Sequence, residues 1–351
     1  TCELFGAHKL LQDIKKLENK NIKVVPGPCM GRCNVAPTVC VGKNYVDEAN
    51  FDKVKKTIDE KTFDPFIPDY INLSSYKKNG GYEIADKIKN GVISKKQVLD
   101  SLNESGLKGK GGAGFPTGKK WEIVSNYNGK KYVAVNGDEG EPGTFKDRSY
   151  LESDPHRFLE GALIASYFIN AQKVYIYMRD EYPTVIKILL DEINKMEDEE
   201  IIPKDFFIVR RGAGAYICGE ESAMIESIEG KRGLPRHRPP YVAEIGLFGC
   251  PTLTNNLETL FWVRDIIEKG AKWFAEKGSN GNKGFHSFSV SGRVKNPGVK
   301  VAPAGITIQQ LIDKYCDGMA DGHTFKGYLP GGASGGILPA TMNDIPLDYG
   351  S

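Results

Sequence analysis

Residues 132–143 read YVAVNGDEGEPG, a short apolar run that passes directly into a polar turn broken by glycines. Two further strand patterns stand at 174–178 and 206–209, and helical patterns at 154–169 and 183–194 separate the three. This alternation predicts a mostly parallel α/β sheet. Because open sheets of this kind bind ligands at the carboxyl ends of their strands, the polar turn is the first candidate site.

The polar turn carries three carboxylates, Asp138, Glu139 and Glu141, with Asn136 before them. Such a group can bind a metal, act as acid or base, or hydrogen-bond sugar hydroxyls and a flavin ring. No histidine stands in this segment, which counts against a metal site. A solvated acidic turn is the alternative to all three functions.

A glycine cluster at 109–114 (GKGGAG) has the Gly-x-Gly-x-x-Gly spacing that lets backbone N–H groups approach a phosphate. A helix beginning after Pro116 would add its positive end, and Lys120 could neutralise the phosphate. A helical pattern, not a strand, precedes the cluster, so it does not fit the usual dinucleotide fingerprint. A mobile surface loop is the alternative.

A second glycine loop at 211–221 (RGAGAYICGEE) follows the strand pattern at 206–209. Two such loops at strand ends are hard to explain as structure alone, and they favour a binding function. Cys218 lies in the second loop without a histidine in its neighbourhood, so we interpret it as an ordinary loop thiol.

Composition limits the class of protein. The 351 residues carry a net charge of +2 and are 40% hydrophobic, which is enough for two or three domains and gives no argument for nucleic-acid binding. No apolar run reaches the roughly 18 residues of a membrane helix, so we expect no direct membrane insertion. Seven cysteines is an odd number that argues against a disulfide framework and favours the cytoplasm.

The two ends of the chain differ from its middle. A small α/β unit is expected at 1–61, with strands at 22–25 and 38–41, followed by a proline-rich linker and helices. From residue 285 the pattern becomes β-rich, with a strand at 286–291 and a helix at 307–315.

Two cysteines of the first unit, Cys29 and Cys33, stand close together in the loop PCMGRCNVAP (28–37). With Cys2 they give three thiolates, whereas an iron–sulfur cluster usually takes four. A zinc site and a redox disulfide are the alternatives. Cys40 lies in a strand pattern, and we expect it in the core.

Four segments carry a resemblance to a known family. They are GLKGKGGAGFPTG (106–118), NGDEGEPGTFKDR (136–148), YICGEESA (216–223) and TNNLETL (254–260). The chain from about residue 70 to its end resembles the NADH-oxidising flavoprotein, the 51-kilodalton type subunit of complex I, which also occurs in soluble hydrogenases and NAD-linked formate dehydrogenases. Lysines at 108 and 110 stand where that family commonly has arginines, which keeps the charge but loses a bidentate fork.

The first 61 residues resemble a thioredoxin-like [2Fe–2S] domain. The resemblance implies that Cys2, Cys29 and Cys33 are metal ligands, with the fourth ligand upstream of Thr1. A [4Fe–4S] domain is expected only beyond Ser351. Fusion of this domain to the flavoprotein, together with the words GPCMGRC, resembles formate dehydrogenase beta subunits most.

The resemblance implies an α/β fold in three domains. A thioredoxin-like ferredoxin domain is expected at 1–61, and a linker with helices at 62–104. A Rossmann-like domain with a parallel sheet, binding FMN and NADH, is expected at 105–282. A β-grasp domain of the SLBB, ubiquitin-like type is expected at 283–351.

The resemblance also implies the binding residues. Those expected to line the FMN site are Gly109, Gly111, Lys120, Asn136, Asp138, Glu139, Tyr216, Gly219, Glu220, Glu221, Asn255, Asn256 and Thr259. Those expected to contact NADH are Phe115, Glu141, Arg238 and Tyr241. Lys120 should meet the FMN phosphate, and Asp138, Glu139 and Glu220 should meet ribityl hydroxyls or the ring.

The implied activity is hydride transfer between NAD(H) and FMN, with electrons passed on to iron–sulfur clusters. Because the flavin carries the chemistry, no catalytic side chain is assigned. Expected partners are the iron–sulfur and catalytic subunits of a multisubunit oxidoreductase, most like a formate dehydrogenase. The alternatives are the same module in a soluble hydrogenase or respiratory enzyme, a flavin-free dehydrogenase, and a relay or docking subunit that binds no nucleotide.

Overall fold

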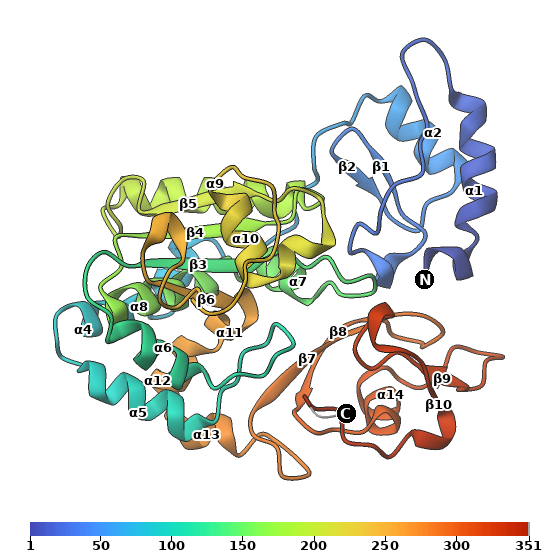
Figure 1. The fold of residues 1–351 in the computed structure, drawn as a ribbon. Coiled ribbons are helices and arrows are strands. Elements are labelled where there is room, and N and C mark those ends of the chain that lie inside the picture. Colours follow the sequence, from blue (N-terminus) through green and yellow to red (C-terminus); the bar gives the residue numbers. More distant parts are fainter. Residues whose placement is uncertain (350–351) are drawn as a thin grey trace.

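The computed structural model describes residues 1–349 and arranges them in three parts (Figure 1). The largest part surrounds a parallel sheet in the strand order β5-β4-β3-β6. Its strands are β3 (Tyr132–Gly137), β4 (Lys173–Met178), β5 (Phe207–Arg211) and β6 (Thr252–Asn256). The predicted α/β class and its parallel sheet are therefore confirmed.

Strand β6 is an element that the sequence patterns did not predict. Its sequence, TLTNN, ends in two asparagines, which strands disfavour. Pairing with β3, from Tyr132 opposite Thr252 to Asn136 opposite Asn256, nevertheless holds it in the sheet. The ladder, not local propensity, determines this strand.

The two faces of the sheet carry different helices because side chains alternate along each strand. Val133 and Val135 lie in the same core as the helices α8 (Pro155–Ile169), α9 (Pro183–Asp198) and α11 (Leu257–Phe261). Ala134 points to the opposite core, which it shares with α10 (Glu221–Ile228). Helix α8 begins as predicted, with Asp154 accepting a hydrogen bond from the Arg157 N–H at its N-cap.

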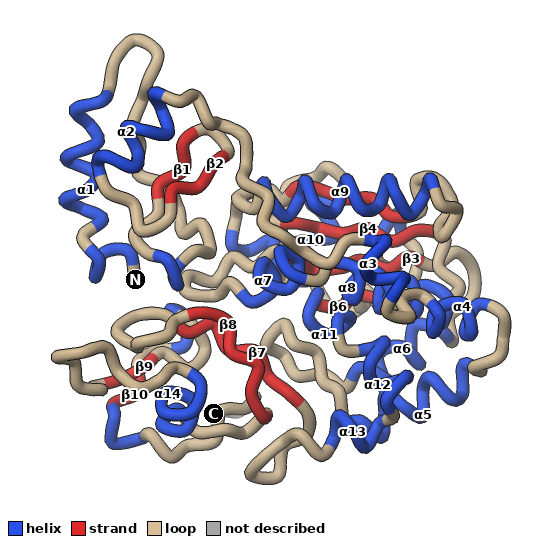
Figure 2. Tube along the Cα trace, turned by 180° about the vertical axis from the view of Figure 1, so that it is seen from behind, coloured by secondary structure: helices blue, strands red, loops and turns tan. Residues whose placement is uncertain are grey.

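Shorter helices surround this core, and Figure 2 shows α4, α5, α6, α12 and α13 grouped beyond one edge of the sheet. Their bounds, with those of α3 and α7, are α3 (Leu73–Lys78), α4 (Glu83–Lys89), α5 (Lys95–Ser105), α6 (Thr117–Ser125), α7 (Lys146–Ser153), α12 (Val263–Lys269) and α13 (Ala271–Ala275).

The N-terminal part is small. It consists of α1 (Ala7–Ile14), the antiparallel strands β1 (Val39–Val41) and β2 (Asn44–Val46), and α2 (Phe51–Asp59). Its buried core contains Ile14, Val46, Ala49 and Val54. The strand predicted at 38–41 is thus confirmed as β1.

Two expectations for this part are wrong. No strand forms at 22–25: Ile22 makes only an isolated bridge with Asn19, and the following Pro26 offers no N–H for a ladder. Cys40 does not lie in the core. It is half-buried, and its thiol donates to the Gly42 carbonyl at an S···O distance of 3.3 Å.

The C-terminal part contains the antiparallel strands β7 (Phe285–Val290) and β8 (Gly298–Pro303), helix α14 (Ile308–Tyr315) and the short pair β9 (Gly327–Tyr328) and β10 (Leu338–Pro339). Its core is formed by Ala302, Ile306, Leu311 and Leu347. The strand and the helix predicted here are confirmed, while the SLBB assignment stays a prediction.

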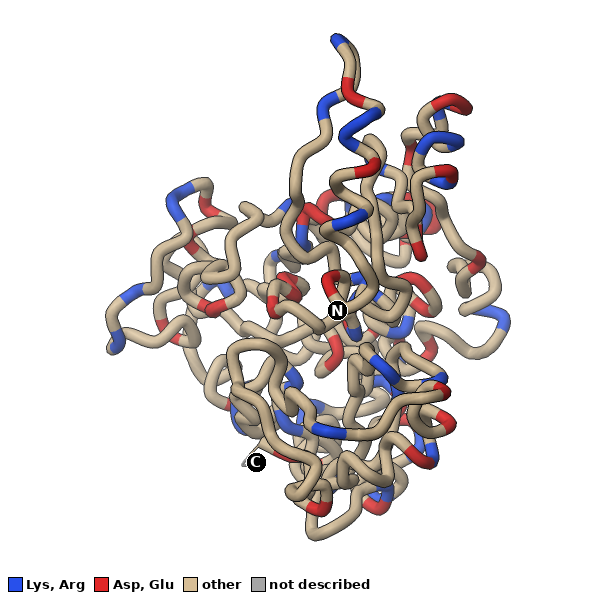
Figure 3. The backbone as a smooth tube through the Cα atoms, turned by 90° about the vertical axis from the view of Figure 1, so that its right-hand side faces the viewer, with Lys and Arg blue, Asp and Glu red and all other residues tan. Residues whose placement is uncertain are grey.

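Charge is spread over the molecule, and Figure 3 shows basic and acidic residues interspersed along the chain. Among the helices within residues 1–349, none has the length and apolarity needed to span a bilayer.

Candidate functional site

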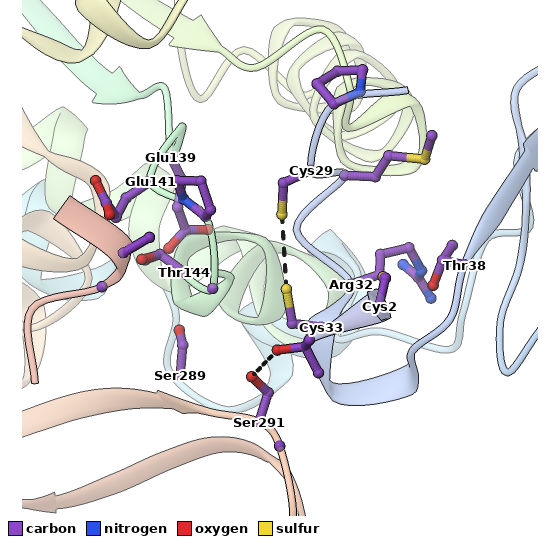
Figure 4. A pocket seen from close by; sticks show the side chains of 18 of the residues that line it. Cys2, Cys29, Arg32, Cys33, Thr38, Glu139, Glu141, Thr144, Ser289 and Ser291 are labelled. Carbon is purple, nitrogen blue, oxygen red and sulfur yellow. Dashed lines mark hydrogen bonds between the residues drawn. The ribbon is translucent and has the colours of Figure 1, made fainter. Parts of the chain in front are cut away.

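The carboxyl ends of the strands and the glycine cluster meet at one cavity of about 1920 Å³. The N-terminal and C-terminal parts supply its other walls (Figure 4). The predicted site residues in its wall are Gly111, Asn136, Asp138, Glu139, Glu141, Tyr216, Gly219, Glu220, Asn256, Cys2, Cys29 and Cys33. The remaining predicted residues, Gly109, Phe115, Lys120, Glu221, Arg238, Tyr241, Asn255 and Thr259, lie outside this lining.

The glycine cluster is an ordered loop rather than a free one. The Gly109 N–H donates to the Phe115 carbonyl at 2.8 Å, and the Lys110 N–H donates to the Thr259 hydroxyl at 2.9 Å. A Cβ on Gly111 would lie 3.3 Å from the Asn256 Cβ, so the backbone passes close to the end of β6. Thr259 therefore acts by holding the loop and not by facing the cavity.

The side chain of Lys110 points away from the loop and into the protein. Its ammonium donates to the Phe285 carbonyl at 2.7 Å, and burial lowers its pKa to about 8. Lys110 keeps the positive charge of the arginine that the family commonly has at this position. Its ammonium, however, is bound to the C-terminal part and does not point into the loop.

Helix α6 begins immediately after the loop, as predicted, and places Lys120 near the end of β6. The Lys120 ammonium lies 2.9 Å from the Thr254 hydroxyl and 3.1 Å from a Glu221 carboxylate oxygen. Burial alone would raise the pKa of Glu221, but the charge of Lys120 and a hydrogen bond from Thr254 outweigh it and lower the pKa. Lys120, predicted to bind the FMN phosphate, is thus paired with Glu221, which was predicted to line the FMN site.

Two asparagines connect the strand ends. The Asn136 amide donates to the Gly219 carbonyl at 2.7 Å and so joins the polar turn to the second glycine loop. Asn255 is buried and accepts a hydrogen bond from the indole N–H of Trp121 at 2.9 Å. Asn255 therefore supports α6, while Asn256 is the one that reaches the cavity wall.

The neighbouring carboxylates Asp138 and Glu139 differ in what binds them. One oxygen of Asp138, Oδ2, is buried and has no hydrogen-bond partner among the described residues, and burial raises the pKa of this group to about 6. Glu139 accepts hydrogen bonds from the Asp147 N–H at 3.0 Å and the Tyr182 hydroxyl at 3.2 Å. Burial and the nearby Asp147 raise the pKa of Glu139 to about 7.

Glu220 is the N-cap of α10, accepting hydrogen bonds from the Ser222 and Ala223 N–H groups at 2.9 Å and 3.0 Å. Its other oxygen is paired with Arg238, which also lies 3.3 Å from Glu221. Arg238, predicted to contact NADH, is thereby attached to the carboxylates of the flavin set.

The other residues predicted to contact NADH lie at the surface. Phe115 and Tyr241 are 46% and 57% exposed, and Tyr216, which was predicted to line the FMN site, is 62% exposed in the cavity wall. Exposed aromatic rings beside a cavity can stack on a flat base. Glu141 is bound by the C-terminal part: its carboxylate accepts from the Ser334 N–H at 2.8 Å and the Ser334 hydroxyl at 2.9 Å.

A buried group of charged side chains, of which Lys146 and Asp147 line the cavity, was not among the predicted site residues. The Lys146 ammonium lies 2.7 Å from Asp147 and 3.1 Å from Glu258, and the Asp147 carboxylate accepts from the Asn256 amide at 2.8 Å. These residues lie in the sequence motifs that carry the family resemblance. Lys146 and Asp147 belong to the motif at 136–148, and Glu258 belongs to the motif at 254–260.

The structure brings two of the three predicted metal-binding cysteines together. The sulfurs of Cys29 and Cys33 are 3.8 Å apart. Cys2, from the helical turn at the start of the chain, lines the same cavity (Figure 4). The pKa of Cys33 is raised first by its contact with Cys29, then by burial, and also by the nearby Cys2. Within residues 1–349, no group of three or more histidine, cysteine or acidic side chains is arranged to hold a metal ion.

The contact between the Cys29 and Cys33 sulfurs, in which either sulfur could be the donor, outweighs burial and lowers the pKa of Cys29. Deprotonated cysteine is the form that binds iron, so this pair fits half of a cluster's ligand set.

The strand-end residues fit a phosphorylated ligand with a polar ring system. The glycine loop lines the cavity and runs directly into the N-terminus of α6. Lys120 of this helix lies outside the lining, with its ammonium on Thr254 and Glu221. Among the buried side-chain atoms that have no hydrogen-bond partner within residues 1–349 are Asp138 Oδ2, in the cavity wall, and the Thr117 hydroxyl oxygen at the first position of α6. Buried polar atoms are usually satisfied, so a ligand is the expected partner.

The sequence matches a family model described as the Nuo51 FMN-binding domain over residues 102–265. An NADH-quinone oxidoreductase subunit of Rhizobium meliloti (strain 1021) is 41% identical over 294 residues, which is 81% of this chain and 70% of the relative. The corresponding NADH-quinone oxidoreductase subunit of Aquifex aeolicus (strain VF5) is 42% identical over 290 residues, 80% of this chain and 67% of the relative.

A solved structure extends the similarity to the N-terminal part. A chain of an NAD⁺-reducing [NiFe]-hydrogenase in the air-oxidized state superposes with a TM-score of 0.84 and 28% sequence identity. The match covers 98% of this chain and 64% of that chain. The present chain therefore spans less than two thirds of the hydrogenase chain that it matches.

Proposed function

The chain belongs to the family of NADH-oxidising flavoprotein subunits of the 51-kilodalton type, and from this premise we propose that its strand-end site binds FMN and exchanges hydride between FMN and NAD(H). The observation that carries the proposal is that the glycine loop and Asp138, whose Oδ2 has no hydrogen-bond partner among the described residues, line one cavity at the carboxyl edge of a parallel sheet. Bound FMN would accept or donate the hydride, and the protein orients and tunes it.

The chain's own residues divide the binding between them. The backbone N–H groups of Gly111 and Gly112, which line the cavity, and the N-terminus of α6 would hold the phosphate, with Lys120 as its counter-charge. Asn136, Asp138 and Glu220 would face sugar hydroxyls or the ring. Glu139 has its carboxylate bound by protein donors, so its contribution is to fix the polar turn.

The nucleotide is proposed to be NAD(H) rather than its 2′-phosphorylated relative. Glu141 stands at the cavity wall, and a second carboxylate, Glu220, carries the nearby Arg238. A 2′-phosphate near these carboxylates would be repelled. The exposed rings of Phe115 and Tyr241 offer surfaces on which an adenine could stack.

Iron–sulfur clusters and partner subunits complete the proposal. Cys29 and Cys33, with Cys2 and a ligand upstream of Thr1, would hold a [2Fe–2S] cluster, and a [4Fe–4S] cluster would be bound beyond Ser351. We assign residues 1–61, 62–104, 105–282 and 283–351 to the ferredoxin-like, linker, flavin and SLBB units. The protein would work in the cytoplasm within a multisubunit oxidoreductase that contains iron–sulfur and catalytic subunits.

The last part of the proposal is the identity of that oxidoreductase. We favour an NAD-dependent formate dehydrogenase, because the N-terminal unit is fused to the flavoprotein and carries the sequence motif GPCMGRC. A soluble hydrogenase is the second candidate, favoured by the structural match over 98% of the chain. Formate-dependent against hydrogen-dependent reduction of NAD⁺ by the complex co-purified with this chain distinguishes the two.

An absorption spectrum of the purified protein tests the main proposal. Flavin bands that bleach on addition of NADH, and FMN rather than FAD in the acid extract by chromatography, are the expected results. A protein without flavin, or one whose flavin is not reduced by NADH, would favour the alternative of a relay or docking subunit.

A further inference from the structure

The cysteine loop, residues 28–34, packs directly against the polar turn at 138–144. Figure 4 shows Cys29, on the N-terminal loop, facing the turn that carries Glu139, Glu141 and Thr144. Cys29 of the first loop and Glu139 and Gly143 of the second line the same cavity. Side chains that contact both loops can therefore fix the distance between them.

Arg179, which follows β4, lies between the two loops and is only 5% exposed. One nitrogen of its guanidinium donates to the Glu139 carbonyl at 3.2 Å. The other terminal nitrogen donates to the Cys29 carbonyl. A single planar fork thus joins the polar turn to the cysteine loop.

Tyr182 and Arg148 add to the same connection. The Tyr182 hydroxyl donates to the Glu139 carboxylate, and a Cβ on Gly31 would lie 2.2 Å from that hydroxyl oxygen, so Gly31 is pressed against it. The Arg148 guanidinium donates to the Gly31 carbonyl at 3.0 Å and to the Asn34 side chain at 3.1 Å. Glu139 and the cysteine loop are therefore held by shared, buried partners.

The chemistry of the fork explains why an arginine stands at this position. The two carbonyls belong to chain segments more than a hundred residues apart, and each takes a different guanidinium nitrogen. A lysine carries the same charge but presents one compact ammonium, which cannot reproduce a fixed fork. Glu181 neutralises the charge, with its carboxylate 3.5 Å from the Arg179 Nε.

We propose that Arg179 is a positioning residue that sets the spacing between the strand-end site and the cysteine loop. Its significance rests on the proposed function: if the strand end holds a flavin and the loop holds a cluster, this fork fixes the path between them. Arg179 contacts backbone carbonyls in both loops and is assigned no contact with nucleotide or iron.

Hydrogen–deuterium exchange of residues 28–34 in the purified full chain tests the spacing directly. In Arg179→Lys we expect exchange in this segment to increase by about tenfold, because the segment opens locally more often. Arg211→Lys is the matched control. Arg211 lies beside Met178 in the neighbouring strand, but its guanidinium is exposed and paired with Asp180. Wild-type exchange in Arg179→Lys would overturn the proposal.

A second variant keeps the test independent of how the protein tolerates a change at a buried arginine. Asn34→Ala removes a partner of Arg148 on the cysteine loop and leaves Arg179 intact. We expect a smaller increase in exchange at 28–34 in this variant. An increase larger than that of Arg179→Lys would transfer the positioning role to Arg148.

Redox measurements separate positioning from binding. With ferricyanide taking electrons directly from the flavin, Arg179→Lys should keep its flavin content and its KM for NADH within about twofold of wild type. Where the preparation carries a cluster, NADH-driven bleaching of the cluster should slow relative to bleaching by dithionite. Loss of flavin in Arg179→Lys would contradict the proposal, whereas a wild-type protein without flavin would contradict the proposed function and leave the exchange result standing.

Discussion

The parallel sheet and the N-terminal part hold their candidate site residues in different ways. Around the sheet, strand residues such as Val133, Ala134 and Val135 are fully buried between helices on both faces. The N-terminal part has a core with only four buried residues and two three-residue strands. The strand-end residues are thus placed by packing, while the cysteine loop is placed by polar contacts with its neighbour.

This difference predicts where substitutions are tolerated. A site fixed by a packed core fails when the core is disturbed, because interiors are close-packed and transmit strain. A site fixed by a few hydrogen bonds changes its position while the fold survives. Substitutions in the two regions should therefore differ in kind, and the largest effect is expected in the packed core.

Gly161→Ala should be the most destabilising single change. A Cβ at this position in α8 would lie 1.9 Å from the Leu260 carbonyl oxygen of α11, and both segments are backbone in the main core. We expect a loss of about 3 kcal/mol in the free energy of unfolding, measured in urea, or failure to fold. In the N-terminal part, a Cβ on Gly27 would meet only the flexible end of Met30, so Gly27→Ala should change stability little. The reverse order would contradict the comparison.

Gly111→Val should give folded protein with little flavin. The Cβ alone would approach the Asn256 side chain to 3.3 Å, and the two methyl groups would obstruct the N–H groups that are proposed to face the phosphate. Gly109→Ala is the control, because the nearest atom to its Cβ would be at 3.6 Å. Flavin absorbance per protein after gel filtration measures the effect. Full flavin content in Gly111→Val would show that the site lies elsewhere.

Sequence patterns predicted the strand ends well because one rule governs them: parallel strands of a sheet finish at the same edge. The polar turn after β3 and the second glycine loop after β5 were found in this way. The same reasoning missed β6, whose asparagines disfavour a strand, although the words TNNLETL had already marked its end as part of the site. Ladder pairing with β3 supplied what local propensity could not.

The sequence patterns could not predict which way the site side chains point or what they contact. Asp138 and Glu139 are adjacent acidic residues, yet only Asp138 keeps an oxygen without a protein partner among the described residues. The partners of Glu139 are the Asp147 N–H, 8 residues further on in α7, and the Tyr182 hydroxyl, 43 residues further on. Similarly, no pattern indicates that Arg179 joins Glu139 to Cys29, because that contact exists only once two parts of the fold meet.

The cysteine loop gives the next prediction, an iron content that depends on the proposed ligand thiols and not on the other cysteines. In a chain extended upstream of Thr1 and prepared anaerobically, Cys33→Ser should abolish the [2Fe–2S] iron, since Cys33 lies 3.8 Å from Cys29. Cys218→Ser is the control, because this thiol is buried in the second glycine loop of the sheet part. Iron analysis and the paramagnetic signal of the reduced protein measure both. An extended wild type without iron would mean that the N-terminal part has kept its fold and lost its metal.

Asp138 should make the flavin-free protein less stable as the pH rises. Burial raises its pKa from 3.8 to about 6, so the folded state binds more protons than the unfolded state between these values. Stability is therefore lost as the pH increases through this window, by an amount on the order of 1–2 kcal/mol. Asp138→Asn should flatten the dependence of the urea midpoint between pH 4 and about 7. Asp180→Asn, at an exposed position, is the control, and an unchanged slope in Asp138→Asn would refute the assignment.

The smallest expected effect concerns the contact between Glu141 and Ser334, which joins the sheet part to the C-terminal part. The Ser334 N–H and hydroxyl each donate to one oxygen of Glu141, and Gly332 lies so close that a Cβ there would be 2.5 Å from the Glu141 Cγ. The bound carboxylate is the one proposed to meet the nucleotide. Ser334 and the hydroxyls of the nucleotide should therefore compete for the same oxygens.

Ser334→Ala removes the hydroxyl and leaves the N–H, so one of these hydrogen bonds remains. A neutral hydrogen bond contributes about 0.5–1.5 kcal/mol, and its loss should tighten NADH binding by about threefold. The KM for NADH with ferricyanide should fall accordingly, while kcat and flavin content stay at wild-type values. Ser291→Ala, which removes a hydroxyl that is hydrogen-bonded to the Thr1 side chain, is the control. A rise in KM would instead mean that Ser334 orients Glu141 for the nucleotide. The C-terminal part would then contribute to nucleotide binding and would not compete with it.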